Sequence, residues 1–136
     1  MPDCTFCKIV QGELPSSKIF EDEDILAFLD ITPINPGHTL IIPKLHYDDL
    51  RDMSDPLIGR LFSAAAELAP AICRGVGAKD FNLGMNNGMD AGQVVFHAHA
   101  HIMPRFPDDG LELWSGKKYA EGEQERVHEK IMKEMK

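Results

Sequence analysis

The stretch QVVFHAHAHIMPR, residues 93–105, places histidine at three alternate positions, His97, His99 and His101. Side chains alternate between the two faces of a β-strand, so the three imidazoles would share one face. At a rise of ~3.3 Å per residue, their α-carbons would be about 6.6 Å apart. The pattern predicts a strand over residues 93–105, ended by Pro104, whose opposite face packs on a helix through Phe96, Ala98, Ala100 and Ile102.

The rest of the chain predicts an α+β fold with an antiparallel sheet, in which strands precede and follow one main helix. Residues 18–31 hold two short apolar runs around an acidic turn, as a hairpin would, and residues 39–42 form a β-rich run before Pro43. The main helix is expected from Asp55, a possible cap, to about residue 78, because apolar residues recur there at helical spacing. A further strand is expected over residues 80–87.

The 136 residues fit a single domain, 1–136, with a cysteine-bearing N-terminal segment, 1–12, and a solvated C-terminal helical tail from about residue 118 to 136. The 22 acidic and 14 basic residues give a net charge of −8, which argues against binding of a nucleic acid polymer. No apolar run approaches the ~20 residues that cross a bilayer. The first residues lack the pattern of a signal peptide, so we expect a soluble, cytoplasmic protein.

Three interpretations of the histidine row follow from the residues alone. Chance on a solvent-facing strand is improbable, since the chain holds only 6 histidines. The row could bind a catalytic metal ion. Alternatively, one neutral imidazole could be a nucleophile toward phosphorus while its neighbours bind the phosphate oxygens.

The motif HAHAHIMPR resembles the histidine-triad motif of the HIT family of nucleotide hydrolases and transferases. Residues 4–50 resemble the N-terminal half of its small, Hint-like branch, and GMNNGMDAGQVVFHAHAHIMPR resembles its active-site hairpin. The resemblance therefore covers nearly the whole chain. It implies the HIT fold, an antiparallel sheet of about five strands with one main helix and a C-terminal helix, in a homodimer.

The resemblance also implies roles for individual residues. His99 would attack the α-phosphorus and form a nucleotidyl-histidine, with its other ring nitrogen donating to the main-chain carbonyl of His97, while His101 and His38 line the phosphate. The remaining nucleotide-binding residues would be Phe6, Ile9, Leu29, Asp30, Ile31, Asn86, Gly92, Gln93 and the backbone of Val94. On sequence alone, Asn86 is equally an ordinary turn residue, Asp30 a turn cap, and Phe6 and Ile9 core residues. Position 94 is often Ser or Thr in Hint-like relatives, so Val94 departs from the family pattern.

Cys4 and Cys7 have the spacing of zinc ligands, but two cysteines supply only half of a tetrahedral site. By resemblance to zinc-bearing branches of the family, His46 and His97 would complete a closed, structural zinc site. The alternative is a pair of metal-free thiols. A redox role is disfavoured because no helix obviously begins at Cys4, and Cys73 is expected to be a buried, inert thiol.

The leading functional hypothesis is a hydrolase that cleaves a nucleoside 5′-monophosphate from an amine or phosphate leaving group. Its purine or other nucleotide substrate and a second copy of the chain would be the only partners, with neither nucleic acid polymer nor membrane involved. The first alternative is a dinucleoside polyphosphate hydrolase. Others are a zinc-stabilised nucleotide-binding regulatory module with little activity, and a metallohydrolase that uses the triad as ligands.

Overall fold

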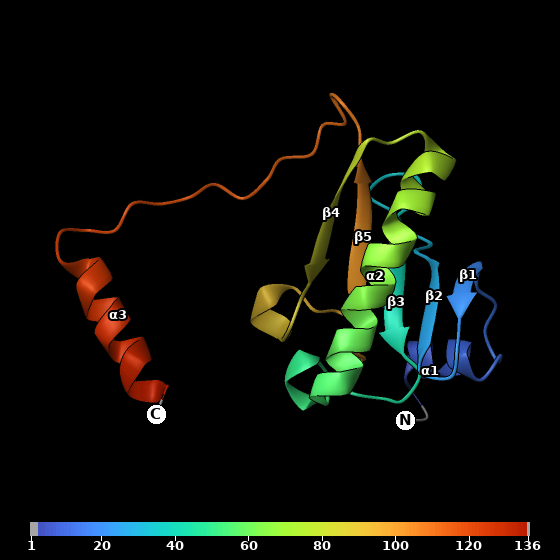
Figure 1. Ribbon diagram of the computed structural model, residues 1–136, viewed down its shortest axis with the longest axis horizontal. Helices are drawn as coiled ribbons and strands as arrows, with labels where there is room; N and C mark the ends of the chain where they lie inside the picture. Colours follow the sequence, from blue (N-terminus) through green and yellow to red (C-terminus); the bar gives the residue numbers. More distant parts are fainter. Residues whose placement is uncertain (1–2, 136) are drawn as a thin grey trace.

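A five-stranded antiparallel sheet organises the computed structural model, which describes residues 3–135. Its strand order is β1-β2-β3-β5-β4, and the antiparallel pairing confirms the α+β prediction; Figure 1 shows the strands lying behind one long helix. The strands are β1 (Lys18–Glu21), β2 (Ile25–Leu29), β3 (Thr39–Pro43), β4 (Asp80–Met85) and β5 (Ala100–Arg105).

The β1–β2 hairpin turns on an acidic residue, as predicted. Asp22 Oδ1 accepts hydrogen bonds from the main-chain N–H groups of Asp24 and Ile25, both at 2.8 Å. This arrangement closes the turn with a side chain, which is why aspartate suits the position. β2 then pairs with β3 along its whole length, from Ile25↔Pro43 to Leu29↔Thr39.

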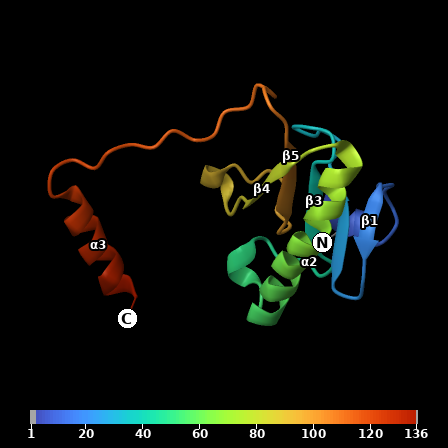
Figure 2. The same cartoon turned by 45° about the horizontal axis from the view of Figure 1, so that its top comes forward.

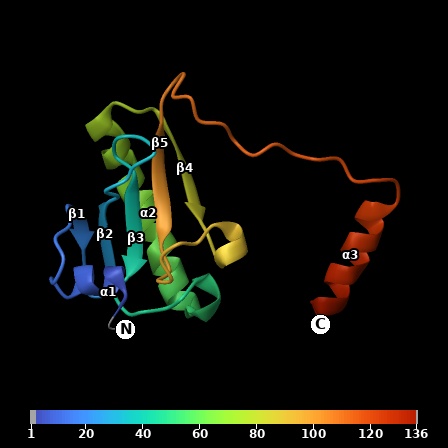
Figure 3. The same ribbon diagram turned by 180° about the vertical axis from the view of Figure 1, so that it is seen from behind.

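Both faces of β2 and β3 are covered, which explains their continuous apolar runs. On one face the sheet packs against α2 (Asp55–Val76). On the other it packs against α1 (Thr5–Val10), which Figure 3 shows from the side opposite α2. The first core includes Ile25, Ala27, Ile41, Leu61, Ala65 and Ile102; the second contains Phe6, Ile9, Leu26, Phe28, Leu40 and Ile42.

The main helix, α2, begins at Asp55, one residue earlier than a cap at Asp55 would allow. Ser54 is the N-cap and its hydroxyl accepts from the N–H of Leu57 at 3.4 Å, so the prediction that Asp55 caps the helix is wrong. Gly77, at φ 78°, ends it in the left-handed conformation. By length and composition alone, α2 could also cross a membrane. Its buried residues face the sheet, as in the core helix of a globular domain.

The strand predicted over residues 93–105 is shorter, because β5 begins only at Ala100. Residues 93–99 form an irregular segment with a bend, so His97 and His99 precede the strand. Pro104 does not end the strand: it pairs with Phe81 of β4, beyond the point where β3 stops at Thr39↔Ile102. Phe96 does not pack on the helix either and is 45% exposed. β4 likewise ends at Met85, earlier than the predicted strand of residues 80–87.

The C-terminal tail stands away from this body, as Figures 1 and 2 both show. An extended segment leads to α3 (Glu123–Glu134), so the helix begins later than about residue 118. No residue of α3 is buried. Two short 3₁₀ helices, η1 (Leu50–Asp52) and η2 (Met89–Ala91), complete the elements.

Candidate functional site

A cavity of about 630 Å³ lies on the face of the sheet opposite α2. α1, the end of β2 and the 86–95 loop surround it, and His99 and His101 form part of its wall. The cavity brings together ten of the predicted nucleotide-binding residues: Phe6, Ile9, Leu29, Asp30, Ile31, Asn86, Gly92, Val94, His99 and His101.

Sequence reasoning missed other residues of the cavity wall. Phe28 lies two positions after Leu26 on the same face of β2, and its ring contacts that of Phe6 at a centroid distance of 5.5 Å. Strand alternation over residues 25–29 could have found it. The segment after α1 gave no such signal, because only the fold brings it to the cavity. The missed residues are Thr5, Leu14, Pro15, Ser16, Phe28, Thr32, Leu40 and Val95.

The tautomer of His99 follows from one hydrogen bond. Its Nδ1 lies 2.7 Å from the main-chain oxygen of His97, which can only accept, so Nδ1 carries the proton. In the neutral ring Nε2 then keeps a free lone pair. Burial lowers the pKa of His99 below its ordinary value, which outweighs the opposite effects of the His97 carbonyl and Asp30. His99 is therefore a neutral, oriented imidazole in the wall of the cavity, and its free Nε2 lone pair is chemically able to act as a nucleophile.

His38 and His101 form a chain of hydrogen bonds with a definite direction. The N–H of Ile34 donates to His38 Nδ1 at 3.1 Å, which leaves the proton of neutral His38 on Nε2. That Nε2–H donates to His101 Nδ1 at 2.9 Å, which in turn places the proton of His101 on its Nε2. Within residues 3–135, His101 Nε2 is buried and has no partner. A buried donor of this kind is suited to a ligand oxygen.

This assignment requires both rings to be neutral. Burial, with the neighbouring imidazoles of His99 and His38, lowers the pKa of His101 to about 4. Asp30 Oδ2 lies 3.7 Å from His38 Nε2 and would favour a charged His38. Burial nevertheless lowers the pKa of His38, since the carboxylate is too distant for a direct hydrogen bond and the ring is only 4% exposed.

The 86–95 loop is held by Gln93, whose side chain is buried and directed away from the cavity. Its Oε1 accepts from the N–H of Gly88 at 2.8 Å, and its Nε2 donates to the carbonyls of Asp48 at 2.6 Å and Val95 at 3.0 Å. Both amide donors are thus used within the protein. Gln93 is absent from the cavity wall, so its side chain shapes the loop instead of contacting a ligand there.

Gly92 and Val94 form the part of the loop nearest the cavity. Gly92 has φ +90° and adopts the left-handed conformation that disfavours side chains. Val94 lines the cavity and is 86% exposed as a residue; a serine or threonine at this position would offer a hydroxyl donor there.

A second cluster, Cys4–Cys7–His46–His97, lies beside the cavity, and its potential ligand atoms all fall within 4.8 Å of one another. His97 Nδ1 is 3.4 Å from Cys4 Sγ and 3.6 Å from Cys7 Sγ, and His46 Nδ1 is 3.4 Å from Cys7 Sγ. Tetrahedral zinc with ordinary bond lengths would separate sulfur and nitrogen ligands by about 3.6 Å. The donor set and its spacing therefore fit a closed tetrahedral metal site.

The outer nitrogens of both histidines in this cluster are also engaged. His97 Nε2 donates to the carbonyl of Pro43 at 2.8 Å, and His46 Nε2 donates to Asp48 Oδ1 at 3.0 Å. Each bond leaves Nδ1 unprotonated and turned toward the cysteines, as a metal ligand must be.

The prediction that no helix begins at Cys4 is wrong, because α1 starts directly after it, at Thr5. Cys4 is the N-cap of α1 and its Sγ accepts from the N–H of Cys7. A six-residue helix has almost no periodicity, so it could not be detected from the sequence pattern. Cys73 is buried in α2, as expected, where burial raises the pKa of its thiol.

Comparisons with known proteins agree with this geometry. The family model for the HIT domain matches residues 11–108. An Arabidopsis thaliana protein named an adenylylsulfatase is 46% identical over 109 residues, covering 80% of this chain, which spans only 55% of that protein's length. A Bacillus subtilis protein, "Protein hit", is 46% identical over 104 residues, covering 76% of this chain and 72% of its own.

Solved structures extend the likeness to the whole chain. A crystal structure of a Streptococcus mutans protein superposes with a TM-score of 0.93 at 42% identity, covering 100% of this chain and 87% of that one. A zinc-bound histidine triad family protein from Mycobacterium smegmatis superposes with a TM-score of 0.78 at 34% identity, covering 99% of each chain.

Proposed function

The chain belongs to the HIT domain family, and from that premise we propose that it is a nucleotidyl hydrolase acting through His99. Its substrate is a nucleoside 5′-monophosphate joined to an amine or phosphate leaving group. The observation that carries this proposal is the 2.7 Å hydrogen bond from His99 Nδ1 to the His97 carbonyl. This bond leaves the lone pair of Nε2, on the opposite side of the ring, free. His99 forms part of the wall of the cavity that holds the proposed base-binding and phosphate-binding residues.

The reaction proceeds in two balanced steps. The Nε2 lone pair of His99 forms a bond to the α-phosphorus, while the bond from phosphorus to the leaving group breaks and its electron pair departs with that group. His101 Nε2–H is the donor placed to hydrogen-bond a phosphate or leaving-group oxygen. Water then attacks the same phosphorus, and the bond from phosphorus to Nε2 breaks, which restores the neutral ring of His99. The proton that the water loses passes to the departed leaving group or to solvent, and the nucleoside monophosphate is released.

The remaining wall of the cavity supplies binding. Phe6, Ile9, Leu29 and Ile31 offer an apolar surface to the base. Asp30 Oδ1 already accepts from the N–H and hydroxyl of Thr32, so its Oδ2 is the oxygen offered to a ribose hydroxyl. Main-chain amides near Gly92 can approach the phosphate closely. An acidic protein thus binds an anion through local donors instead of net charge.

The test is mass spectrometry of protein quenched during turnover. A nucleotidyl mass increase on the peptide containing His99 is expected, and it should vanish in His99→Gln. Turnover that chelators abolish, with no covalent nucleotide at any time, would instead support the metallohydrolase. Tight nucleotide binding without turnover would support the regulatory module. Within the triad, both nitrogens of His97 and the Nδ1 atoms of His99 and His101 already have partners, which argues against the triad as a ligand set.

The leaving group has a second candidate, because the Arabidopsis relative is named an adenylylsulfatase. Sulfate as a leaving group is, like phosphate, a stable oxyanion that departs without protonation by a general acid. Such a leaving group suits this site, because Val94 has no hydroxyl group that could donate a proton. Turnover of adenosine 5′-phosphoramidate, adenosine 5′-phosphosulfate and a diadenosine polyphosphate should be compared in one assay. Preference for the last of these would favour the dinucleoside polyphosphate hydrolase.

The metal proposed for the cysteine–histidine cluster is structural zinc. Two thiolates and two imidazoles would leave no open position, and the thiolate charges would offset that of the ion, so it supplies fold stability and no chemistry. Elemental analysis of protein purified without chelator should find about one zinc per chain. Protein free of zinc under these conditions would contradict the assignment.

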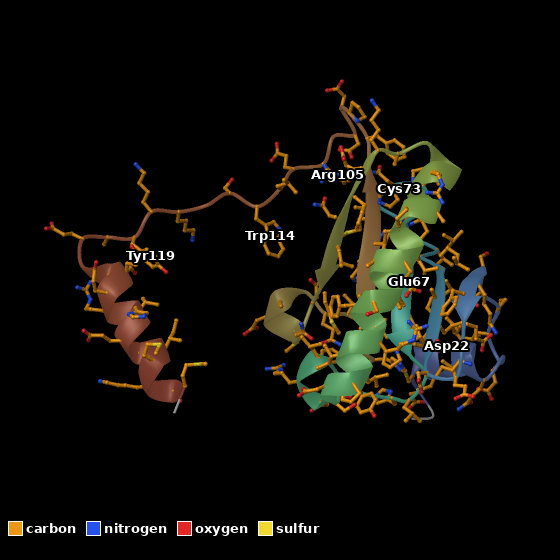
Figure 4. All side chains as sticks on the ribbon, viewed as in Figure 1. Asp22, Glu67, Cys73, Arg105, Trp114 and Tyr119 are labelled. Atoms are coloured by element: carbon orange, nitrogen blue, oxygen red, sulfur yellow. The ribbon has the colours of Figure 1, made fainter. Side chains whose placement is uncertain are left out.

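We also propose that the chain is one domain, is cytoplasmic and forms a homodimer. α3 buries no residue and Trp114 is 95% exposed, and Figure 4 shows Trp114 and Tyr119 on the tail away from the body. A single 12-residue helix is marginal in water, so the tail needs a surface to cover it. Sedimentation equilibrium should give twice the chain mass; a monomer at micromolar concentration would contradict the dimer.

A further inference from the structure

We infer that metal occupancy of the Cys4–Cys7–His46–His97 cluster sets the nucleotide affinity of the neighbouring cavity, so that the two sites are energetically coupled. The inference rests on the proposed function, since it assigns a regulator to the same cavity. Three independent structural connections join the cluster to the cavity: the helix α1, residue His97 and residue Gln93.

The first connection is α1, which contributes different residues to the two sites. Cys4 and Cys7, at its N-cap and third position, belong to the cluster, whereas Phe6 and Ile9 line the cavity. A helix of six residues is too short to persist by itself in water, so its anchors decide its position. With the metal bound, both cysteines fix the helix and thereby the apolar wall offered to the base.

The second connection passes through His97. Its ring belongs to the cluster, while its main-chain oxygen orients the nucleophile His99. The ring of Phe6 contacts both imidazoles edge-on, at centroid distances of 5.9 Å to His97 and 5.1 Å to His99. If His97 moved when the metal was lost, its main-chain oxygen, which accepts the hydrogen bond from His99, would move with it. The ring of Phe6, which contacts both imidazoles, would shift as well.

The third connection reaches the 86–95 loop. His46 is a cluster member, and two residues later the carbonyl of Asp48 accepts from Gln93 Nε2 at 2.6 Å. Gln93 Oε1 accepts a hydrogen bond from the N–H of Gly88 at 2.8 Å. Gln93 is thus a positioning residue that ties the loop of the cavity to the segment carrying a metal ligand.

Coupling of this kind is reciprocal: whatever factor zinc adds to nucleotide affinity, nucleotide adds to zinc affinity. Couplings in proteins commonly amount to about 5–150-fold. We expect about tenfold here. The effect is one of position, since the cluster offers no open site through which the ion could touch the nucleotide.

The experiment measures AMP affinity by isothermal titration calorimetry for the full chain, zinc-loaded and after removal of zinc with a chelator. The dissociation constant should rise about tenfold without zinc, and competition with a zinc dye should show zinc binding tightened by the same factor in saturating AMP. Equal, measurable AMP affinities in both metal states would overturn the coupling alone. Failure of AMP to bind in either state would overturn the proposed function as well.

Hydrogen exchange distinguishes this local mechanism from loss of the fold. Removal of zinc should speed exchange in residues 5–10 and 86–95, while β2 and β3 keep their protection. A uniform rise across β2 and β3 would overturn the inference, because zinc would then act on global stability only.

Two variants test the third connection. Gln93→Glu removes the donors to the carbonyls of Asp48 and Val95, and should reduce the coupling factor to threefold or less while zinc affinity without AMP changes less than about twofold. The matched control is Thr32→Val, which disturbs the Asp30 contact on the side of the cavity away from the cluster. It should weaken AMP binding equally in both metal states. An unchanged coupling factor in Gln93→Glu would exclude Gln93 as the connection.

Discussion

The main-chain oxygen of His97 accepts a hydrogen bond from His99 Nδ1 at 2.7 Å, while the Nδ1 of the His97 ring lies 3.4 Å from Cys4 Sγ and 3.6 Å from Cys7 Sγ. One residue therefore serves two sites without conflict, because its backbone and its side chain are separate hydrogen-bonding groups. The arrangement fixes the tautomer of His99 by a group that mutation of a side chain cannot remove.

Replacement of the central histidine separates chemistry from binding. His99→Gln lacks the imidazole nitrogen that attacks phosphorus, so kcat should fall about a thousandfold or more. Its AMP dissociation constant should stay within about fivefold, since the rest of the cavity wall is unchanged. Steady-state kinetics and calorimetry measure the two effects, and turnover close to that of the parent chain would refute the nucleophile.

The hydrogen bond that His38 donates to His101 should contribute to catalysis, because it fixes the tautomer of His101. His38→Asn retains an acceptor for the N–H of Ile34, but its shorter amide does not reach the position of His38 Nε2. The hydrogen bond to His101 is then lost, so His101 Nε2 would no longer be fixed as the protonated nitrogen. Loss of one such bond should lower kcat roughly tenfold, with KM changed less. A variant with parental kcat would show that the tautomer of His101 has no role.

Stability should fall in mild acid because of buried imidazoles. The pKa of His101 is about 4 in the folded chain, whereas an unfolded histidine has a pKa near 6.5. Between these values the unfolded chain binds more protons, so the free energy of unfolding falls as pH drops from 7 toward 4. Thermal melts at pH 5, 6 and 7 measure this slope, and His101→Gln should reduce it. An identical slope in the variant would contradict the shifted pKa.

The chain contains its own control for the metal cluster. Cys7→Ser should abolish tight zinc binding, because it removes one of four ligands. Cys73→Ala should keep one zinc per chain, since Cys73 lies toward the far end of α2, as Figure 4 shows. Elemental analysis of both variants checks this, and equal zinc contents would mean that the metal is bound elsewhere.

Gly37 precedes His38 in a tight position that only glycine suits. It has φ +89°, and an added Cβ would lie 3.0 Å from a methyl group of Val76 and 3.1 Å from Pro104. Gly12 has a similar φ of +82° with nothing within 4 Å. Gly12→Ala should thus cost about 1–2 kcal/mol through backbone strain alone. Gly37→Ala should lower the free energy of unfolding further, as urea denaturation would show; equal losses would exclude the steric contribution.

Much of the site could be predicted because alternation and motif spacing survive local irregularity. The HAHAH row still presents His99 and His101 to one cavity although only His101 lies within β5. Pro104 was misread as a strand end because proline is excluded only where a neighbouring strand needs its N–H, and β3 has already stopped there. That boundary depends on the partner strand, which no local pattern contains.

The sequence by itself determined which residues the proposed chemistry would use, since residue types and their spacing set the strand faces, the turns and the two histidine-bearing clusters. Only the tertiary structure decided which nitrogens of His38 and His101 hold the protons, that the side chain of Gln93 serves the loop instead of the cavity, and that α1 bridges the two sites. The physical reason is that these properties depend on hydrogen bonds between distant segments, such as His38 with His101 and Gln93 with Asp48. Such bonds form only when the folded chain brings those groups within about 3 Å and excludes water from them.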